Sequence, residues 1–220
     1  MTLALALLVL QAGREPVLKQ VDLPHAYYWR EMYVPQVTSG PSSATWSPDG
    51  TELIYSMQGS LWRQRIESGV AQQLTASAGY DYQPDWSPDG KTVVFAHYAR
   101  DAIELELLDL VSGAVSALTA NGAVNVEPRW SPDGTRIAFV SSAYHGRWHI
   151  FTLTPAGGEP VRLTEDNDSN LPRYYYSKWD HYISPTWSPD GNEIILVSNR
   201  GHIHGTRMIS LPSGDHVGEI

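Results

Sequence analysis

Short runs of alternating or continuous apolar residues recur along the chain, and each is bounded by Gly, Pro, Asp or Ser. The clearest runs lie at 52–57, 91–97, 135–142 and 192–198. A second apolar run follows each of them, at 60–69, 103–113, 149–158 and 206–214. Runs of this length with turn residues at both ends are typical of β-strands. The pattern therefore predicts an all-β chain of short strands.

One phrase, Trp-Ser-Pro-Asp-Gly, occurs four times and begins at Trp46, Trp86, Trp130 and Trp187. These tryptophans are 40, 44 and 57 residues apart. A Leu-Thr pair marks the end of each of the first three units, at 74–75, 118–119 and 163–164. The additional length of the third step lies between Thr164 and Trp187. Such regular spacing indicates a structural repeat, because a catalytic motif is needed only once.

The repeated phrase predicts a hairpin turn. Proline suits the second position of a type I turn, serine and aspartate bond to nearby backbone, and glycine accepts the left-handed geometry that follows. We therefore interpret the four aspartates and four glycines as turn residues, and each tryptophan as packing between sheets. These residues are Asp49, Gly50, Asp89, Gly90, Asp133, Gly134, Asp190 and Gly191.

Units of four strands that repeat every 40 to 45 residues are the signature of a β-propeller. We predict a partial ring of about four blades, with one orphan N-terminal strand that belongs to a closing blade. The expected segments are a leader (1–24), the N-terminal strand (25–41), blade 1 (42–80), blade 2 (81–124), blade 3 (125–164), an aromatic insertion (165–184) and a truncated blade 4 (185–220).

The repeat resembles that of TolB-like, WD-related propellers, whose hallmark is a P-x-W-S-P-D-G strand end and a trailing L-T. Pro84, Pro128 and Pro185 occupy the first position of this hallmark. The stretch from His25 to Gln64 is also similar to the N-terminal propeller region of large bacterial amidohydrolase-family proteins. That second resemblance implies a metal-dependent catalytic barrel downstream of this chain. Because TolB-like rings usually contain six or more blades, four blades and one orphan strand also lead us to expect a fragment of a longer protein.

Composition narrows the possible partners and compartments. The formal net charge of −9 argues against nucleic-acid binding, which needs a basic face. There is no cysteine, so disulfides and thiolate metal sites are excluded. The apolar run from Leu3 to Leu10 has the length of a signal-peptide core and predicts a periplasmic or secreted protein. The alternative is a hydrophobic N-terminal strand or helix in a cytoplasmic protein.

Two stretches have partial metal-site patterns. His202 and His204 form an H-x-H pair, but they lie at a strand junction and lack further ligands, so a surface hairpin is expected. Asp166, Asp168 and Asn170 have calcium-loop spacing, but Leu171 and Ser177 replace the required Gly and Glu. We therefore predict a solvated polar turn, no metal and no cofactor. No Gly-x-Ser-x-Gly, phosphate-loop, Rossmann or H-E-x-x-H motif occurs.

The aromatic insertion is the candidate binding surface. It is rich in residue types that are enriched at protein-binding hot spots, namely Arg173, Tyr174, Tyr175, Tyr176, Trp179 and Tyr182. The alternative is that these rings pack on blade edges. The sequence leaves three functions open: a non-catalytic interaction scaffold or substrate gate, the propeller part of an amidohydrolase, and a periplasmic peptide- or lipoprotein-binding protein. The expected partner is a protein, a companion domain or a peptide.

Overall fold

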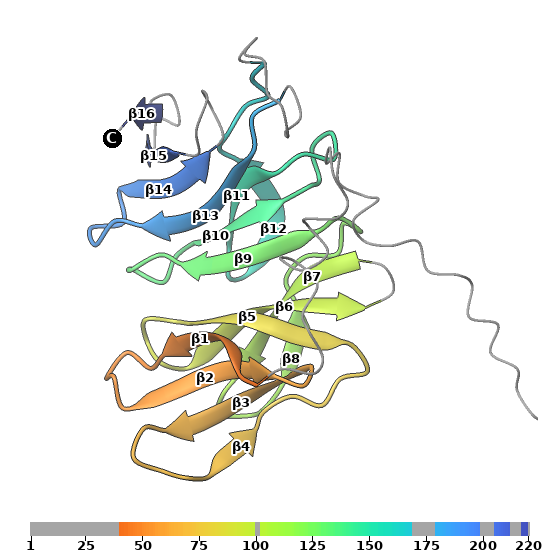
Figure 1. Ribbon diagram of the computed structural model, residues 1–220, viewed down its shortest axis with the longest axis vertical. Coiled ribbons are helices and arrows are strands. Elements are labelled where there is room, and N and C mark those ends of the chain that lie inside the picture. Colours follow the sequence, from red (N-terminus) through yellow and green to blue (C-terminus); the bar gives the residue numbers. More distant parts are fainter. Residues whose placement is uncertain (1–39, 100–101, 169–178, 199–204, 212–216, 220) are drawn as a thin grey trace, which may run out of the picture.

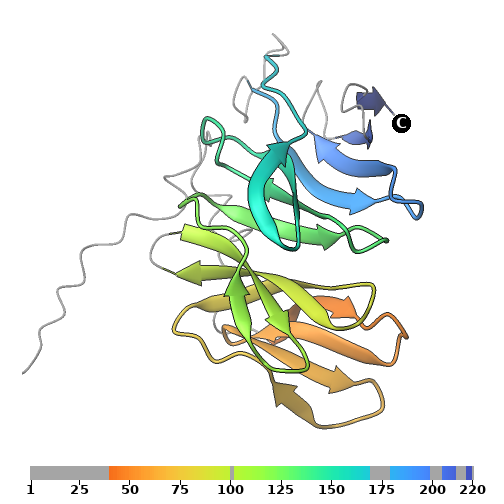
Figure 2. The ribbon, with the colours of Figure 1, turned by 180° about the vertical axis from the view of Figure 1, so that it is seen from behind.

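The computed structural model describes residues 40–99, 102–168, 179–198, 205–211 and 217–219. The predicted leader and nearly all of the predicted N-terminal strand (25–41) lie outside these ranges. The described residues form four antiparallel sheets of four strands each, in the sequential orders β1-β2-β3-β4, β5-β6-β7-β8, β9-β10-β11-β12 and β13-β14-β15-β16. The sheets follow one another in an open arc (Figures 1 and 2).

Each sheet is one blade, numbered in chain order. Blade 1 comprises β1 (Ser42–Trp46), β2 (Glu52–Met57), β3 (Ser60–Arg65) and β4 (Ala71–Gln73). Blade 2 comprises β5 (Tyr80–Trp86), β6 (Thr92–Ala99), β7 (Ala102–Asp109) and β8 (Val115–Ala117). Blade 3 comprises β9 (Asn125–Trp130), β10 (Ile137–Ser141), β11 (His149–Thr154) and β12 (Gly157–Arg162). Blade 4 comprises β13 (Tyr182–Trp187), β14 (Glu193–Ser198), β15 (Gly205–Ser210) and β16 (Val217–Glu219).

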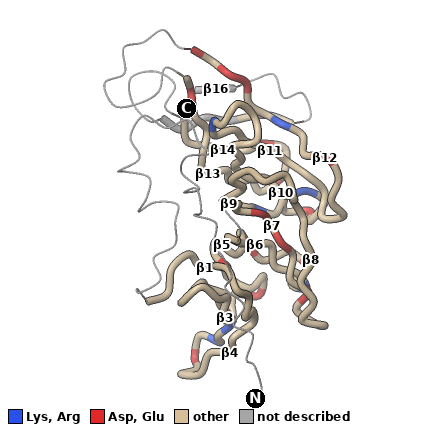
Figure 3. The backbone as a smooth tube through the Cα atoms, turned by 90° about the vertical axis from the view of Figure 1, so that its right-hand side faces the viewer, with Lys and Arg blue, Asp and Glu red and all other residues tan. Residues whose placement is uncertain are grey.

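The first strand of every blade contacts the first strand of the next, through the pairs β1–β5, β5–β9 and β9–β13. These strands therefore form the inner layer, and β4, β8, β12 and β16 are the outer edges, so the fold is the predicted partial propeller. The described part of the chain contains no helix and hence none that could cross a bilayer. Seen from the side, the Lys and Arg positions are scattered over the blades (Figure 3).

The turn predicted from Trp-Ser-Pro-Asp-Gly joins the first and second strands of all four blades. In blade 1 the amide of Gly50 donates to the carbonyl of Ser47 at 2.9 Å. Oγ of Ser47 donates to Oδ1 of Asp49 at 2.6 Å, and the same carboxylate accepts from the amide of Thr51. The φ angles of the four glycines, at positions 50, 90, 134 and 191, lie between 71° and 75°. The residues of the motif thus satisfy one another's hydrogen bonds, so the same turn can form in every blade.

The motif tryptophans of blades 2 and 4 pack against the preceding blade. Trp86 is 7% exposed and lies in a core cluster with Ile54 and Leu61 of blade 1. Trp187 is 9% exposed and packs with Ala138 of blade 3. Trp46 has no described blade before it and is 57% exposed. The repeat therefore builds the interfaces between blades as well as the blades themselves.

A second repeated feature lies three residues before each tryptophan. Ser43, Gln83, Glu127 and Ser184 all have positive φ, between 40° and 55°, where the inner strand bulges away from regular pairing. This left-handed backbone is uncommon for residues other than glycine. In blades 2, 3 and 4 the bulge turns the amide of this residue toward the preceding blade. The amide of Gln83 donates to Ser43 Oγ, that of Glu127 to Gln83 Oε1, and that of Ser184 to Glu127 Oε2. The strained position thus forms a ladder of hydrogen bonds between blades.

A second set of hydrogen bonds joins the inner strands of blades 1 to 3. In these bonds, the amide of a motif tryptophan donates to the residue that precedes the motif tryptophan of the blade before. The amide of Trp86 donates to Thr45 Oγ1 at 3.2 Å, and the amide of Trp130 donates to Asp85 Oδ2 at 2.7 Å. Burial raises the pKa of Asp85 to about 6, and the hydrogen bond from Trp130 and the charge of Arg129 only partly oppose it. Asp85 therefore links blades 2 and 3 at an electrostatic cost when it is ionised.

We expect Asp85→Asn to stabilise the chain at pH 8 by about 2 kcal/mol and to leave it nearly unchanged at pH 4. Because the pKa of Asp85 is raised, its protonated form stabilises the folded chain. This stabilisation is fully present at pH values below 3.8, the ordinary pKa of aspartate, and is lost as the pH rises through about 6. The amide keeps an acceptor for Trp130 but carries no charge. Urea unfolding at both pH values measures the difference. Asp89→Asn is the control, and it should destabilise the chain at pH 8. Turn hydrogen bonds from Ser87 and Lys91 lower the pKa of Asp89, so the ionised carboxylate stabilises the folded state.

Candidate functional site

Antiparallel order places two kinds of connection at opposite ends of each blade. The Trp-Ser-Pro-Asp-Gly turns and the turns between third and fourth strands share one end, which we call the turn rim. The turns between second and third strands and the crossings to the next blade share the other end, which we call the crossover rim. The predicted aromatic insertion connects β12 to β13 and therefore belongs to the crossover rim.

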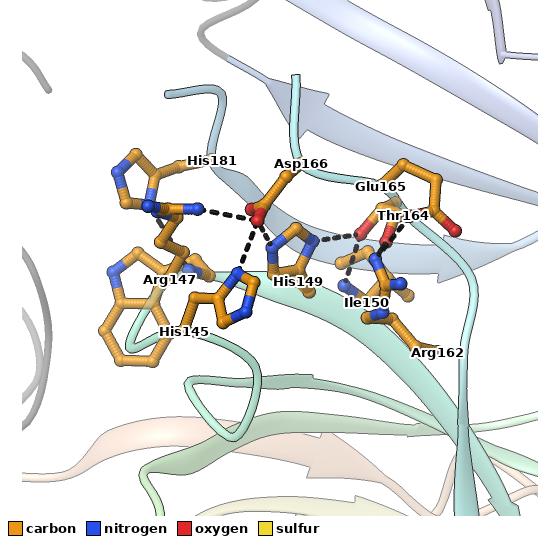
Figure 4. A network of polar contacts seen from close by, with 10 residues as sticks. His145, Arg147, His149, Ile150, Arg162, Thr164, Glu165, Asp166 and His181 are labelled. Carbon is orange, nitrogen blue, oxygen red and sulfur yellow. Dashed lines mark hydrogen bonds and ion pairs between the residues drawn. The ribbon is translucent and has the colours of Figure 1, made fainter. Parts of the chain in front are cut away.

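A network of polar contacts lies on the crossover rim where blade 3 meets blade 4 (Figure 4). We define the rim cluster as His145, Arg147, His149, Arg162 and Asp166, which Figure 4 labels, together with the aromatic residues Tyr144 and Trp179 that stack on its arginines. The turn from β10 to β11 supplies Tyr144, His145 and Arg147, and β11 begins at His149. Arg162 ends β12, and Asp166 and Trp179 flank the part of the insertion that is not described.

Asp166 is the centre of the rim cluster. Its Oδ2 lies 2.6 Å from Nδ1 of His145 and accepts a hydrogen bond from Nη1 of Arg147, also at 2.6 Å. Its Oδ1 lies 3.1 Å from Nε2 of His149. Burial raises the pKa of Asp166, but the bonds with His145 and Arg147 outweigh it, and the pKa falls to about 2. The carboxylate is therefore ionised at any physiological pH and is fully engaged.

Cations in the rim cluster are stacked on aromatic rings. The guanidinium of Arg147 lies 3.9 Å from the ring centroid of Trp179, and that of Arg162 lies 3.8 Å from that of Tyr144. The ring of Tyr144 also stacks on that of His145, with centroids 3.9 Å apart. Stacked arginines and aromatics hold one another in fixed rotamers. The cluster is thus a pre-ordered surface in which Tyr144, Arg147 and Trp179 are partly exposed and His145 is exposed.

Asp166, His149 and Thr164 are arranged like a hydrolytic triad, since Nδ1 of His149 lies 3.0 Å from Oγ1 of Thr164. However, His149 is 0% and Thr164 only 2% exposed, so no substrate can reach the hydroxyl. The threonine also has a structural role, because its Oγ1 accepts a hydrogen bond from the amide of Ile150 at 3.1 Å. Burial lowers the pKa of His149, which keeps the imidazole neutral.

The other blades use the same threonine in the same way. Oγ1 of Thr75 accepts the amide of Leu61, and Oγ1 of Thr119 accepts the amide of Leu105. Thr119 then donates to Glu104, which precedes Leu105 just as His149 precedes Ile150. The threonine of each Leu-Thr pair therefore fastens the fourth strand to the third. The apparent triad is a variant of this fastening and not a catalytic device.

The structure places two of the six predicted binding residues. Trp179 is partly exposed on the crossover rim and stacks on Arg147. Tyr182 is 3% exposed, because β13 begins there, three residues before the boundary expected at 185. Tyr182 thus packs beneath His149, with ring centroids 5.8 Å apart. Arg173, Tyr174, Tyr175 and Tyr176 lie outside the described residues, as do His202 and His204.

Asp166 corrects one expectation. The sequence predicts a solvated turn here, but the side chain of Asp166 is only 17% exposed and is bound to His145 and Arg147. Within the described ranges, no group of three or more His, Asp or Glu side chains is arranged to hold a metal ion.

Sequence reasoning did not identify His145, Arg147 and His149 as site residues. Their partner is 17 to 21 residues away along the chain, and no motif joins them. A polar residue stands three positions before each motif tryptophan, at 43, 83, 127 and 184, but this pattern alone predicts neither the positive φ nor the hydrogen bonds between blades.

Comparison with known proteins supports the propeller fold. A family model described as "TolB beta propeller domain" matches residues 30–180. A structure of TolB from Acinetobacter baumannii is 23% identical with a TM-score of 0.67, and the match covers 81% of this chain and 43% of that one. A structure of putative TolB from Agrobacterium tumefaciens is 22% identical with a TM-score of 0.68, and the match covers 81% and 64%.

A puromycin-hydrolyzing peptidase from Mycobacterium tuberculosis is 14% identical with a TM-score of 0.62, and the match covers 84% of this chain and 32% of the peptidase. The chain therefore spans about half the length of the two TolB structures and a third of the enzyme. A search of curated proteins gave no match. The same fold occurs in proteins of different activity, so function must be argued from the site.

Proposed function

The chain belongs to the TolB β-propeller domain family, and from that premise we propose that it is a non-catalytic interaction module. It would bind a protein segment, either of a partner or of a companion domain, on the crossover rim. The observation that carries the proposal is the rim cluster, in which arginines and aromatic rings are held in order around a saturated carboxylate. Arginine, tyrosine and tryptophan are the side chains that contribute most at protein interfaces.

Three properties of the rim cluster favour binding over catalysis. The carboxylate of Asp166 is occupied by three donors, the neutral His149 is buried, and the Thr164 hydroxyl is inaccessible. Rigid side chains lose little conformational entropy on association, so a pre-ordered surface binds at lower cost. The predicted residues Arg173, Tyr174, Tyr175 and Tyr176 belong to the same insertion as Trp179 and would enlarge this surface.

We expect peptides selected against the chain to bind the crossover rim. A displayed random peptide library would be panned on the purified protein, and affinities of synthetic copies measured by calorimetry. Trp179→Ala should weaken binding about tenfold or more, because the ring is partly exposed and tryptophan is enriched at binding hot spots. Lys91→Ala is the matched control, because Lys91 is 71% exposed on the turn rim. Selected peptides that bind both variants equally would contradict the assigned surface.

A second candidate is that the module serves a hydrolase, as the propeller part of a longer amidohydrolase. It is supported by the sequence likeness of residues 25–64 to the propeller region of amidohydrolase-family proteins. Under either candidate the chain alone should hydrolyse nothing, with or without added zinc. Hydrolysis of ester or amide substrates by the purified chain, abolished by chelators, would refute the non-catalytic assignment. Export to the periplasm remains part of the proposal, on the strength of the apolar run from Leu3 to Leu10.

A further inference from the structure

The turn rim has a groove between blades 2 and 3. It has a volume of about 520 Å³. Blade 2 contributes Ser87, Pro88, Asp89 and Thr92, and blade 3 contributes Trp130, Asp133, Gly134 and Pro155. The groove lies at the opposite end of the blades from the crossover rim, so a ligand bound in it would be independent of the proposed function.

At the two neighbouring interfaces, an arginine of one blade covers the tryptophan of the next. The guanidinium of Arg63 in blade 1 lies 5.5 Å from the ring centroid of Trp86 in blade 2. The guanidinium of Arg136 in blade 3 lies 4.8 Å from that of Trp187 in blade 4. Nη2 of Arg136 also donates to the carbonyl of Gly191 in the next turn, at 3.0 Å. The repeat thus has a standard way of capping this indole with a cation.

Blade 2 has no cation at either of the two equivalent positions. Thr92 stands six residues after Trp86, as Arg136 stands six after Trp130. Leu107 pairs with Val94 on the neighbouring strand, as Arg63 pairs with Ile54. Threonine is too short to reach the next tryptophan and leucine carries no charge, so Trp130 lines an open groove. Lys91 is nearby, but its Nζ is 3.9 Å from Asp89 and its side chain is 71% exposed.

The groove has the remaining features of a cation site. Asp89 and Asp133 border it, and turn hydrogen bonds, from Ser87 and Ser131 above all, lower the pKa of both carboxyls. Both are therefore ionised at neutral pH. Gly134, whose carbonyl corresponds to the one that Arg136 bonds in the next turn, also lines the groove.

We propose that this groove binds the guanidinium group of an arginine from outside the chain, stacked on Trp130 where the neighbouring blades place Arg63 and Arg136. A guanidinium is planar, stacks on an indole and donates several hydrogen bonds in its plane, so it can bond a carbonyl and a carboxylate while it is stacked. The volume is within the range of small-ligand sites.

The test is a titration of the full chain, followed through its indole N–H resonances by nuclear magnetic resonance. The ligand is N-acetyl-arginine methylamide, and the citrulline and lysine derivatives are the controls. Trp130→Phe assigns the Trp130 resonance. We expect a saturable shift of Trp130 only, with Trp86 and Trp187 unmoved because arginines already cover them. Citrulline has the same shape without charge and should bind about tenfold more weakly or worse.

Two variants exchange the residue types at the equivalent positions of blades 2 and 3. Thr92→Arg supplies a guanidinium at the position of Arg136 and should abolish binding. Arg136→Thr opens the corresponding groove over Trp187 and should add a second responding indole. Equal binding of citrulline or lysine, no saturable shift of Trp130, or unchanged binding by Thr92→Arg would each overturn the proposal. If a variant does not fold, the citrulline comparison on the unaltered chain decides.

Discussion

Trp86→Ala should lower the free energy of unfolding by about 3 to 5 kcal/mol, the usual cost of truncating a buried tryptophan. Trp86 is 7% exposed and is packed against Ile54 and Leu61 of the preceding blade, so the change opens a cavity between two blades. Urea unfolding followed by circular dichroism and by hydrogen exchange measures the loss.

Trp46→Ala is the matched control, because it changes the same residue of the same motif. Trp46 is 57% exposed, so its truncation removes little buried area and should cost less than about 1 kcal/mol. Exchange of the blade 2 amides should accelerate in Trp86→Ala and not in Trp46→Ala. Equal losses in the two variants would show that the tryptophan acts within its own hairpin, and not between blades.

The strands and turns could be predicted because their causes are local. Serine, proline, aspartate and glycine form the turn without distant partners, as the hydrogen bonds of Ser47, Asp49 and Gly50 show. A five-residue motif is therefore enough to predict it. The repeat distance then gave the number of strands in each blade. The β13 boundary was less readable, because Tyr182 joins the strand by pairing with Ser198 and by burial, not by turn chemistry.

The bulges and the rim cluster were not predictable, for different reasons. A residue before proline is expected to be extended, yet Gln83, Glu127 and Ser184 precede prolines and have left-handed φ. Hydrogen bonds to the preceding blade support this geometry, and such bonds exist only once the blades are stacked. The rim cluster depends on a crossing segment that brings Asp166 back over the turn of His145. Loop paths of this kind leave no periodic signal in the sequence.

The repeat also explains how function could diverge within this fold. Positions that close turns or fasten strands keep one chemistry in every unit, as Thr75, Thr119 and Thr164 do. Positions beside them vary, since Glu104 and His149 occupy one equivalent place, and Thr92 and Arg136 another. Both candidate surfaces, the rim cluster and the Trp130 groove, lie at such variable positions. Comparison between blades therefore distinguishes scaffold from site within a single sequence.

Asp166→Asn should destabilise the chain by about 2 to 4 kcal/mol at pH 7, because it leaves partly buried Arg147 without a counter-charge. The side chain of Arg147 is only 13% exposed, so water cannot fully replace the carboxylate. The variant should also respond differently to acid. Asp166 has its pKa lowered to about 2, so its contribution is present above its ordinary value of 3.8 and is lost as the pH falls through about 2.

The difference between parent and variant should therefore be largest near neutrality and should shrink as the pH falls from 4 toward 2. Urea midpoints across that interval measure it. Glu165→Gln is the neighbouring control: Glu165 pairs with Arg162 but is 80% exposed, and exposed pairs contribute little. We expect no measurable change from it at any pH. If Asp166→Asn proved as harmless as this control, the rim cluster would be a loose set of surface contacts, and a pre-ordered binding surface could not be built from it.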